Sequence, residues 1–410
     1  MWYALIERQR QWLRTWGAGA WFAYDAWPVP AMGQTASSCF ADLFGPLLGL
    51  ADEAPPFAID AIALDGRRSG IAERIVARTP FCNLRRFARP NAQRAILLCV
   101  PLAGHAAVMM RETVEALLAD GDVYIIDWIN ARDVPLAAGR FGLADYVAML
   151  DGFIDTLVRD GRPLHVLAVC QATLPALGAL TLRAQRALAP PASITLIGGP
   201  LDARINPSKL GLAANSHSLE WCSRHLIDVV PAGFAGHGRR VFPAWLQQAE
   251  IAFVYPHRYV SLVERYARAA SQGNAEAFAT AGRALREYAA LLDMPAEYFL
   301  DIVDIVFQRT LLASRAWRVN GTLVDPAALR DVMLITVEGT RDAVTGAGQT
   351  HAAHALCSDI APHERRRLDV DGCDHYGLFT GEHWSEDVHP VLQAAFAQSE
   401  VAAHRHVSST

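Results

Sequence analysis

The stretch LHVLAVCQATLPAL, residues 164 to 177, decides the fold. Its first half is apolar and rich in branched side chains, as in a parallel strand buried on both faces, and a helix-compatible run, Gln171 to Leu182, follows without a spacer. Cys170 therefore lies at a strand-to-helix corner, which is where a nucleophile elbow presents its side chain. Ala168 and Ala172 are small, as required where strand and helix backbones nearly touch. A lone cysteine usually just packs, so the rest of the chain must decide its role.

Composition excludes several classes of protein. The chain has 410 residues, 52% hydrophobic and 19% charged, so it can bury a large core and is not a disordered protein. Its formal net charge of −5 offers no net positive field to a nucleic-acid partner. The seven cysteines are scattered, odd in number and without CxxC pairs. This pattern predicts free thiols in a reducing cytosol, with neither a disulfide framework nor a zinc site.

Residues 1–27 predict an amphipathic helix. Charges at Glu7, Arg8 and Arg10 interrupt any apolar run, which excludes a signal peptide and a transmembrane span. The apolar positions are unusually aromatic, and they are Trp2, Leu5, Trp12, Trp16 and Trp21. Aromatic stripes at helical spacing usually pack, so we expect this helix to dock on its own domain. The alternatives are a helix that lies on an apolar lipid or polymer body, or one that mediates homo-oligomer formation.

Strands and helices then alternate along the chain. A hairpin is expected over 71–77 and 82–87, around Thr79-Pro80. Buried strands are expected at 95–100, 122–128, 164–169 and 193–199, with helices between them. Repeated strand–helix–strand units specify an α/β protein with a mostly parallel, doubly wound sheet. Together with the corner at Cys170, this pattern predicts the α/β-hydrolase fold.

The alternation stops after residue 206. The next residues contain helical runs and no convincing buried strand, which predicts an all-helical lid inserted between two strands of the sheet. These runs are Pro243 to Ile251, Leu262 to Ala270, Ala275 to Leu292 and Ala296 to Leu312. The expected organisation is an N-terminal helical segment and linker at 1–60, the first part of the core at 61–206, the lid at 207–328 and the second part of the core at 329–410.

The loop PLAGH, residues 101 to 105, follows a central buried strand. Hydrolases of this fold place half of the oxyanion hole in such a loop, using a backbone N–H that no strand or helix claims. Leu102 or Ala103 would supply that N–H, and Gln171, directly after the nucleophile, would supply the second. His105 is expected to pack or to cap the following helix.

Two strand ends beyond the insertion carry an acid and a histidine. The strand 331–339 is followed by Thr340-Arg341-Asp342, and a short strand near Arg367 to Val370 leads to a loop containing His375. An acid in the first loop can reach a histidine in the second and fix its tautomer. The chain order nucleophile, acid, histidine is that of α/β-hydrolases. We therefore expect Cys170, Asp342 and His375 to form one catalytic site.

Two further polar groups have less defined roles. Residues 127–133 lie at the end of another strand, where they either act directly or form a salt-bridged loop that shapes the floor of the site. His351 and His354 are the one close pair that could suggest a metal. They lack a third ligand with usable spacing and are expected on a helix surface, so no metal is predicted.

Over nearly its whole length the sequence resembles the intracellular polyhydroxybutyrate (polyhydroxyalkanoate) depolymerases. The blocks that carry the resemblance are PLAGH (101–105), DWINARDVP (127–135), VCQATLPAL (169–177), GGPLDARINP (198–207), GHGRRVFP (236–243), LDMPAEYFLD (292–301), VEGTRDAVTGAGQT (337–350) and CDHYGLFTG (373–381). Asn130 stands where an aspartate is usual, and Asp374 where a glycine is usual.

The resemblance implies a cysteine in place of the lipase serine, with the triad on Cys170, Asp342 and His375. The implied reaction is cleavage of the ester bonds of a storage polyester through a covalent acyl thioester. Water, or coenzyme A as a co-substrate, would resolve the thioester, and no metal or organic cofactor is needed. The implied partners are the polymer or its oligomers and the granule surface, and the implied location is the cytoplasm, on polyhydroxyalkanoate granules.

Two alternatives remain at this point. Polyhydroxyalkanoate synthases resemble this architecture and also use Cys, Asp and His, but they transfer acyl groups from coenzyme A thioesters to polymer. The Ala-x-Cys-x-Ala elbow and the GHGRRVFP block favour the depolymerase. A granule-coat protein without activity would need only the aromatic N-terminus and would leave the order of the three residues unexplained.

Overall fold

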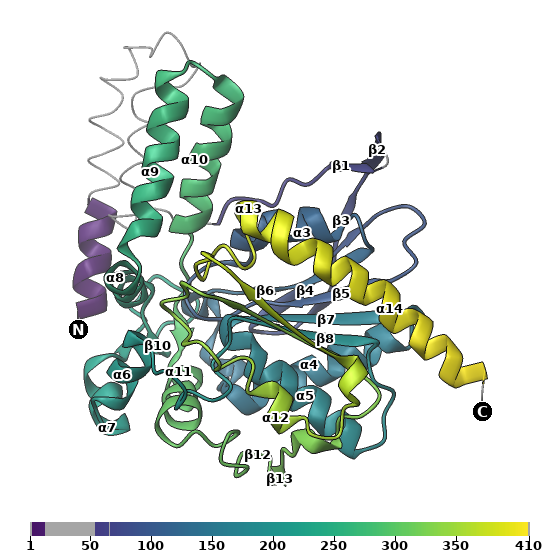
Figure 1. The fold of residues 1–410 in the computed structure, drawn as a ribbon. Coiled ribbons are helices and arrows are strands. Elements are labelled where there is room, and N and C mark those ends of the chain that lie inside the picture. Colours follow the sequence, from purple (N-terminus) through teal and green to yellow (C-terminus); the bar gives the residue numbers. More distant parts are fainter. Residues whose placement is uncertain (1, 13–53, 65, 409–410) are drawn as a thin grey trace.

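A computed structural model describes residues 2–12, 54–64 and 66–408. Its centre is an eight-stranded sheet with the order β15-β14-β8-β7-β5-β6-β4-β3 (Figure 1). The strands from β15 to β6 are parallel, and β4 and β3 form an antiparallel hairpin at one edge. The bounds are β3 Ala72–Arg78, β4 Cys82–Ala88, β5 Ala95–Cys99, β6 Asp122–Trp128, β7 Leu164–Val169, β8 Ser193–Ile197, β14 Met333–Gly339 and β15 Arg365–Val370.

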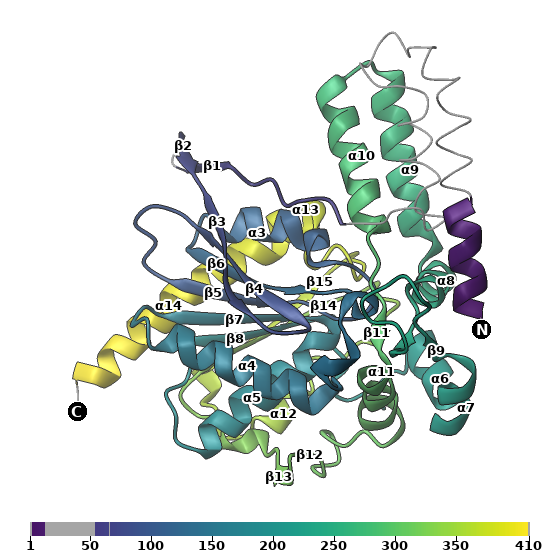
Figure 2. The same cartoon turned by 180° about the vertical axis from the view of Figure 1, so that it is seen from behind.

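Helices cover both faces of this sheet. Every residue of the central strands β5, β7, β8 and β14 is buried, which explains their mostly apolar sequences. One face is covered by α3 (Arg111–Leu117) and α14 (His389–Ser408), and the other by α4 (Leu143–Val158) and α5 (Thr173–Gln185) (Figures 1 and 2). The strand order, the parallel pairing and the turn directly after β7 define an α/β-hydrolase fold.

The register of the sheet aligns the ends of its central strands. Cys99 pairs with Ala168 in the next strand, and Ile197 pairs with both Val169 and Val337. The loops after β5, β7, β8 and β14 therefore start side by side at the carboxyl edge, where open α/β sheets place their ligands.

A long segment is inserted between β8 and β14. Its helices are α6 (Lys209–Asn215), α7 (Leu219–His225), α8 (Ala244–Val254), α9 (Pro256–Ser271), α10 (Ala275–Ala289) and α11 (Ala296–Ile302), which continues as a π-helix over Val303–Gln308. The expectation of an all-helical insertion was wrong. The segment also contains a three-stranded antiparallel sheet of β11 (Met294–Pro295), β10 (Arg240–Phe242) and β9 (Asp228–Val229), and a hairpin of β12 (Arg318–Val319) and β13 (Thr322–Leu323). Strands of two or three residues are too short to produce a period-two pattern.

Helices α9 and α10 form an antiparallel pair that projects from the body (Figures 1 and 2). They have a small core of their own, in which the rings of Tyr266 and Phe278 lie 4.4 Å apart between centroids. Since apolar residues follow only one face of each helix, the outer faces are polar and the pair remains a distinct lobe of the insertion.

Residues 2–12 form a helix that packs beside α8 (Figure 1). Tyr3 and Glu7 are buried, and the Tyr3 hydroxyl donates a hydrogen bond to Asp293. Trp2, Leu5 and Trp12 stay exposed, so the docked face is not the tryptophan stripe of the sequence. Trp16 and Trp21 lie outside the described residues. Among the described residues, no helix is both long and apolar enough to cross a membrane.

Candidate active site

Cys170 occupies a sharp corner between β7 and α5. Its φ is +53°, a left-handed conformation that non-glycine residues rarely adopt and that marks local strain. Ala168 and Ala172, the small residues on either side, are fully buried. Gly199, just after β8, packs against the first residue of α5, and an added Cβ there would lie 1.8 Å from Oγ1 of Thr173. This corner holds the thiol at the carboxyl edge of the sheet.

The three residues expected to act together lie together. Nδ1 of His375 donates a hydrogen bond of 2.7 Å to Oδ2 of Asp342, and the Cys170 sulfur lies near enough to favour a charge on the His375 ring. Oδ1 of Asp342 accepts hydrogen bonds from the backbone N–H groups of Val344 and Thr345, at 2.8 and 2.9 Å. The acid is therefore fixed on one side and fixes the histidine ring on the other.

The electrostatics favour a protonated histidine. Burial opposes a charge on His375, but the Asp342 carboxylate and the Cys170 sulfur outweigh it and raise the pKa of His375 well above its usual range. A second thiol, Cys373, lies two residues before this histidine. Burial raises the pKa of Cys373 to about 12, so that thiol is not a nucleophile at neutral pH.

The loop that carries His375 is held on two sides. Gly198, with φ +54°, makes room for the imidazole, because a Cβ there would lie 3.3 Å from its Cε1 and Nδ1. Asp374 accepts a hydrogen bond from the backbone N–H of Gly377 at 2.7 Å. In the same loop, the ring of Tyr376 lies 5.6 Å from that of Tyr255, directly after α8, between centroids. The aspartate that departs from the resembled family therefore stabilises the histidine loop, which contacts the insertion through Tyr376.

The loop after β5 faces the thiol. The backbone N–H of Ala103 donates a hydrogen bond of 3.1 Å to Oε1 of Gln171, so a side-chain oxygen already occupies the acceptor position at this amide. Leu102 is buried in the main core, whereas Ala103 lines the cavity above Cys170. Of the two expected oxyanion donors in this loop, Ala103 is better placed to meet a ligand.

Gln247 of α8 connects the insertion to the same loop. Its Oε1 accepts a hydrogen bond of 2.6 Å from the backbone N–H of Gly104, and its Nε2 donates to the carbonyls of Phe242 and Leu292. Gln247 is buried, so these bonds are shielded from water. One side chain therefore sets the position of α8 relative to the loop.

A cavity of about 520 Å³ lies over the thiol, and its lining is mostly apolar. Cys170, Gln171 and His375 are at its base. The insertion supplies much of the rest of the lining, including Leu210, Trp221, Leu246, Ile251, Phe299 and Phe307. A cavity of this size and polarity suits an apolar acyl chain.

His105 packs in the cavity wall. Its ring lies 4.9 Å from that of Tyr288 and 6.0 Å from that of Tyr376, between centroids. Burial lowers the pKa of His105 to about 3, so the ring is neutral, and its Nε2 has no hydrogen-bond partner among the described residues. This geometry agrees with the expected packing role.

The loop at the end of β6 supports the site without facing the thiol. Asp127 forms an ion pair of 2.5 Å with Arg85. Oδ1 of Asn130 accepts hydrogen bonds from the backbone N–H groups of Arg132 and Asp293, at 3.2 and 3.1 Å. Of the two roles left open for residues 127–133, these contacts correspond to the structural one.

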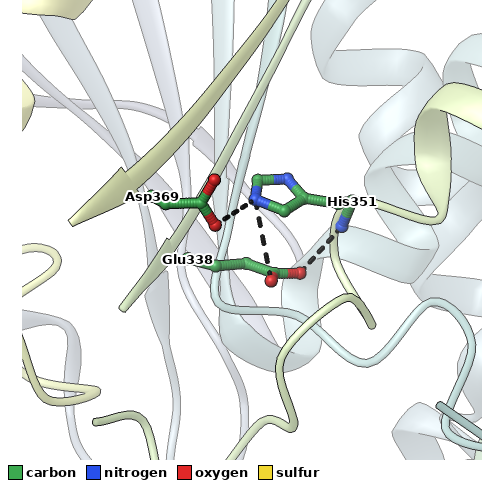
Figure 3. A group of neighbouring side chains, drawn as sticks. All are labelled: Glu338, His351 and Asp369. Carbon is green, nitrogen blue, oxygen red and sulfur yellow. Dashed lines mark hydrogen bonds and ion pairs between the residues drawn. The ribbon is translucent and has the colours of Figure 1, made fainter. Parts of the chain in front are cut away.

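The placement expected for His351 was wrong, because His351 is buried instead of lying on a helix surface. Its Nε2 lies 3.1 Å from Asp369 and 3.6 Å from Glu338, which come from neighbouring strands (Figure 3). These three residues offer ligand atoms within 4.8 Å of one another, as a metal site would. Glu338, however, already accepts hydrogen bonds from the backbone N–H groups of residues 348, 350 and 351, so the cluster anchors the loop that follows Asp342. The spacing of residues in the sequence did not predict this cluster, because its two carboxylates come from separate strands, β14 and β15.

A comparison with models of known protein families identifies the family of this chain. Residues 198–400 match the family model described as PHB de-polymerase C-terminus. The chain belongs to the PHB depolymerase family. This membership makes it an ester-bond hydrolase, and the matched region includes Asp342, His375 and the whole insertion. A search of curated protein sequences returns no match.

Solved structures with a similar fold are distant from this family member in sequence. A thioesterase domain from the curacin biosynthetic pathway is 11% identical, with a TM-score of 0.41 over 80% of this chain and 99% of that one. Carboxyl esterase 2 from Tuber melanosporum is 10% identical, with a TM-score of 0.42 over 80% and 86%. A Paleococcus ferrophilus monoacylglycerol lipase is 11% identical, with a TM-score of 0.42 over 74% and 94%.

Proposed function

We propose that this chain cleaves the ester bonds of polyhydroxybutyrate, a storage polyester of 3-hydroxybutyrate units, through a Cys170, His375 and Asp342 triad. The observation that carries the proposal is the strained Cys170 corner, which lines one apolar cavity together with His375. Family membership supplies the substrate class. A buried, neutral ester chain fits such a lining better than a charged metabolite would.

The first step forms a thioester. His375 takes the proton of Cys170 and so generates the attacking thiolate. The sulfur bonds to the ester carbonyl carbon, the bond from that carbon to the alkoxide oxygen breaks, and His375 returns its proton to the leaving hydroxyl. Asp342 stabilises the intermediate imidazolium, as its hydrogen bond to Nδ1 requires.

The oxyanion would be held by the backbone N–H groups of Gln171 and Ala103. In the structure the Gln171 side-chain oxygen bonds to the Ala103 amide at 3.1 Å. A substrate carbonyl would displace that oxygen and accept a hydrogen bond from the Ala103 N–H group. Because this donor is already in position, no reorganisation of the loop is needed during the reaction. Leu102 remains the weaker of the two candidates in this loop.

The second step resolves the thioester. Water, activated by His375, attacks the acyl carbon, releases the acid and restores the thiol. Coenzyme A could replace water, in which case the product would be a 3-hydroxybutyryl thioester. The insertion, as a lid, would keep bulk water from the intermediate between the two steps.

The site of action in this proposal is the surface of polyhydroxyalkanoate granules in the cytoplasm. Exposed apolar side chains on the N-terminal helix and on the adjacent α8 support contact with a polymer, and they are Trp2, Leu5, Trp12 and Phe253. Replacing Trp2 and Trp12 by Ser should reduce sedimentation with granules and leave hydrolysis of soluble oligomers unchanged. Equal sedimentation of variant and wild type would remove this helix from the proposal.

The deciding experiment measures release of 3-hydroxybutyrate species from native amorphous granules. Wild type and Cys170→Ala are compared with and without coenzyme A, and Cys373→Ala is the matched control thiol. We expect release by the wild type and by Cys373→Ala, and none by Cys170→Ala. Mass spectrometry of the quenched enzyme should find an added acyl group on Cys170. Extension of polymer from 3-hydroxybutyryl-coenzyme A, without release, would assign the chain to the synthase reaction instead.

A further inference from the structure

Helix α8 presents one carboxyl group to the cavity. Residues 246, 247, 250, 251 and 254 all line it, which is the spacing of a single helix face. Four of these contacts are explained by apolar packing or, for Gln247, by hydrogen bonds to the backbone. Glu250 is different, because it is the one acidic side chain among the described residues that line the cavity.

Glu250 has no partner to explain its position. Within the described part of the chain it forms no hydrogen bond or ion pair, and burial in the apolar wall raises its pKa to about 7. A carboxyl group in such a place costs stability unless a ligand uses it. The cavity it faces also contains Cys170 and His375, so the ligand would be the substrate itself.

The chemistry of the polyester identifies the group that meets this carboxyl. Along the chain every oxygen belongs to an ester and is only an acceptor, but one end has a free hydroxyl and the other a carboxylate. A carboxylate acceptor binds the hydroxyl, has no hydrogen bond to offer to internal esters, and repels the carboxylate end. We propose that Glu250 is a specificity residue that binds the free hydroxyl end of the acyl segment attached to Cys170.

This inference rests on the proposed function and adds the end of the polymer at which cleavage begins. The acyl segment bound in the cavity would begin at the hydroxyl end of the polymer, and its length would be the distance that the cavity allows between Glu250 and the sulfur of Cys170. The enzyme would then release short units of fixed size from hydroxyl ends in preference to cutting at random positions.

The test uses three soluble trimers of 3-hydroxybutyrate methyl ester, which differ only at the hydroxyl end. One has the free hydroxyl, one an O-methyl group and one an O-succinyl group that places a carboxylate there. Values of kcat/KM are measured at pH 8 for wild type, Glu250→Gln and Glu250→Leu. Glu264→Gln, an exposed position on α9, is the matched loss of a carboxylate outside the cavity.

We expect wild type and Glu264→Gln to prefer the free hydroxyl over the O-methyl trimer by roughly tenfold to a hundredfold, the range for a hydrogen bond to a charged acceptor. Glu250→Leu should lose this preference, and Glu250→Gln should cleave the O-succinyl trimer better than wild type does. A preference unchanged in both Glu250 variants, or absent in wild type, would overturn the inference while hydrolysis itself stands. Cleavage of none of the trimers by wild type, or cleavage by Cys170→Ala, would instead overturn the proposed function.

Discussion

The Nδ1–H group of His375 donates a hydrogen bond of 2.7 Å to Oδ2 of Asp342, which leaves Nε2 to face the Cys170 side chain. Asp342→Asn would replace that acceptor by an amide and permit the wrong tautomer. We expect kcat to fall on the order of 10³- to 10⁴-fold with little change in KM, as in other triads. The control is Asp374→Asn, which removes the carboxylate next to His375 in the sequence and should lower kcat by less than tenfold. Equal losses in the two variants, measured with a soluble trimer ester, would contradict the assigned acid.

The raised pKa of His375 predicts how folding stability depends on pH. A group whose pKa is higher in the folded state than in the unfolded state binds protons more tightly when folded. Its stabilising contribution is complete below the unfolded value of about 6.5 and is lost as pH rises through the folded value. The Tm advantage of wild type over His375→Gln should therefore shrink as pH is raised from 6 to 9 in thermal unfolding scans. A growing advantage would contradict the raised pKa.

The position of Gln247 predicts a large stability effect from a neutral side chain. Gln247→Leu would leave one buried backbone N–H and two buried carbonyls without their partner. Each such group costs about 1–3 kcal/mol, so the free energy of unfolding should fall by roughly 3 kcal/mol or more. Gln248→Leu, at a partly exposed position of the same helix, should change it by less than about 0.5 kcal/mol. Urea titration of both variants tests this, and similar midpoints would show that Gln247 is not an anchor.

The tight contact at Gly199 predicts that an added methyl group is not tolerated. In Gly199→Ala the new Cβ would lie 1.8 Å from Oγ1 and 2.5 Å from Cβ of Thr173, so the corner at Cys170 must shift. We expect loss of activity and a destabilisation of about 3 kcal/mol or more, beyond ordinary overpacking. Gly152→Ala, inside α4, should instead stabilise the fold by roughly 0.5–1 kcal/mol, because the new Cβ would meet no atom within 4 Å apart from its chain neighbours and the backbone of its own helix. An active, stable Gly199→Ala enzyme would show that the contact can relax.

Much of the central sheet could be predicted because its strands are long, apolar and buried on both faces. The strand at Leu164–Val169 has the bounds that its sequence indicated. In the hairpin, β3 is shifted by one residue from the expected 71–77, and β4 begins at Cys82 as expected and ends one residue later than predicted. Their places after successive strands, together with the chain order, brought Asp342 and His375 into one hypothesis with Cys170, because parallel strands end at a common edge.

The insertion was harder to predict for a physical reason. Its contribution to the site comes from side chains such as Gln247, Glu250 and Tyr255, which have no motif of their own and matter only because α8 lies over the oxyanion loop. The cluster around His351 was missed in the same way, since Glu338 and Asp369 reach it from other strands. Tertiary proximity of this kind leaves no periodic signal in a single sequence.

The hydrogen bond from Tyr3 to Asp293 also constrains how the protein is made. The two residues are 290 positions apart, so this hydrogen bond cannot form until residue 293 has left the ribosome. At ordinary rates of synthesis that delay is roughly fifteen to sixty seconds. During that time an aromatic segment is exposed and free to associate elsewhere. Complete docking of the N-terminal helix is therefore a late event of biogenesis, and nascent chains that stall before its partners Asp228, α8 and Asp293 are made would be the ones most in need of a chaperone.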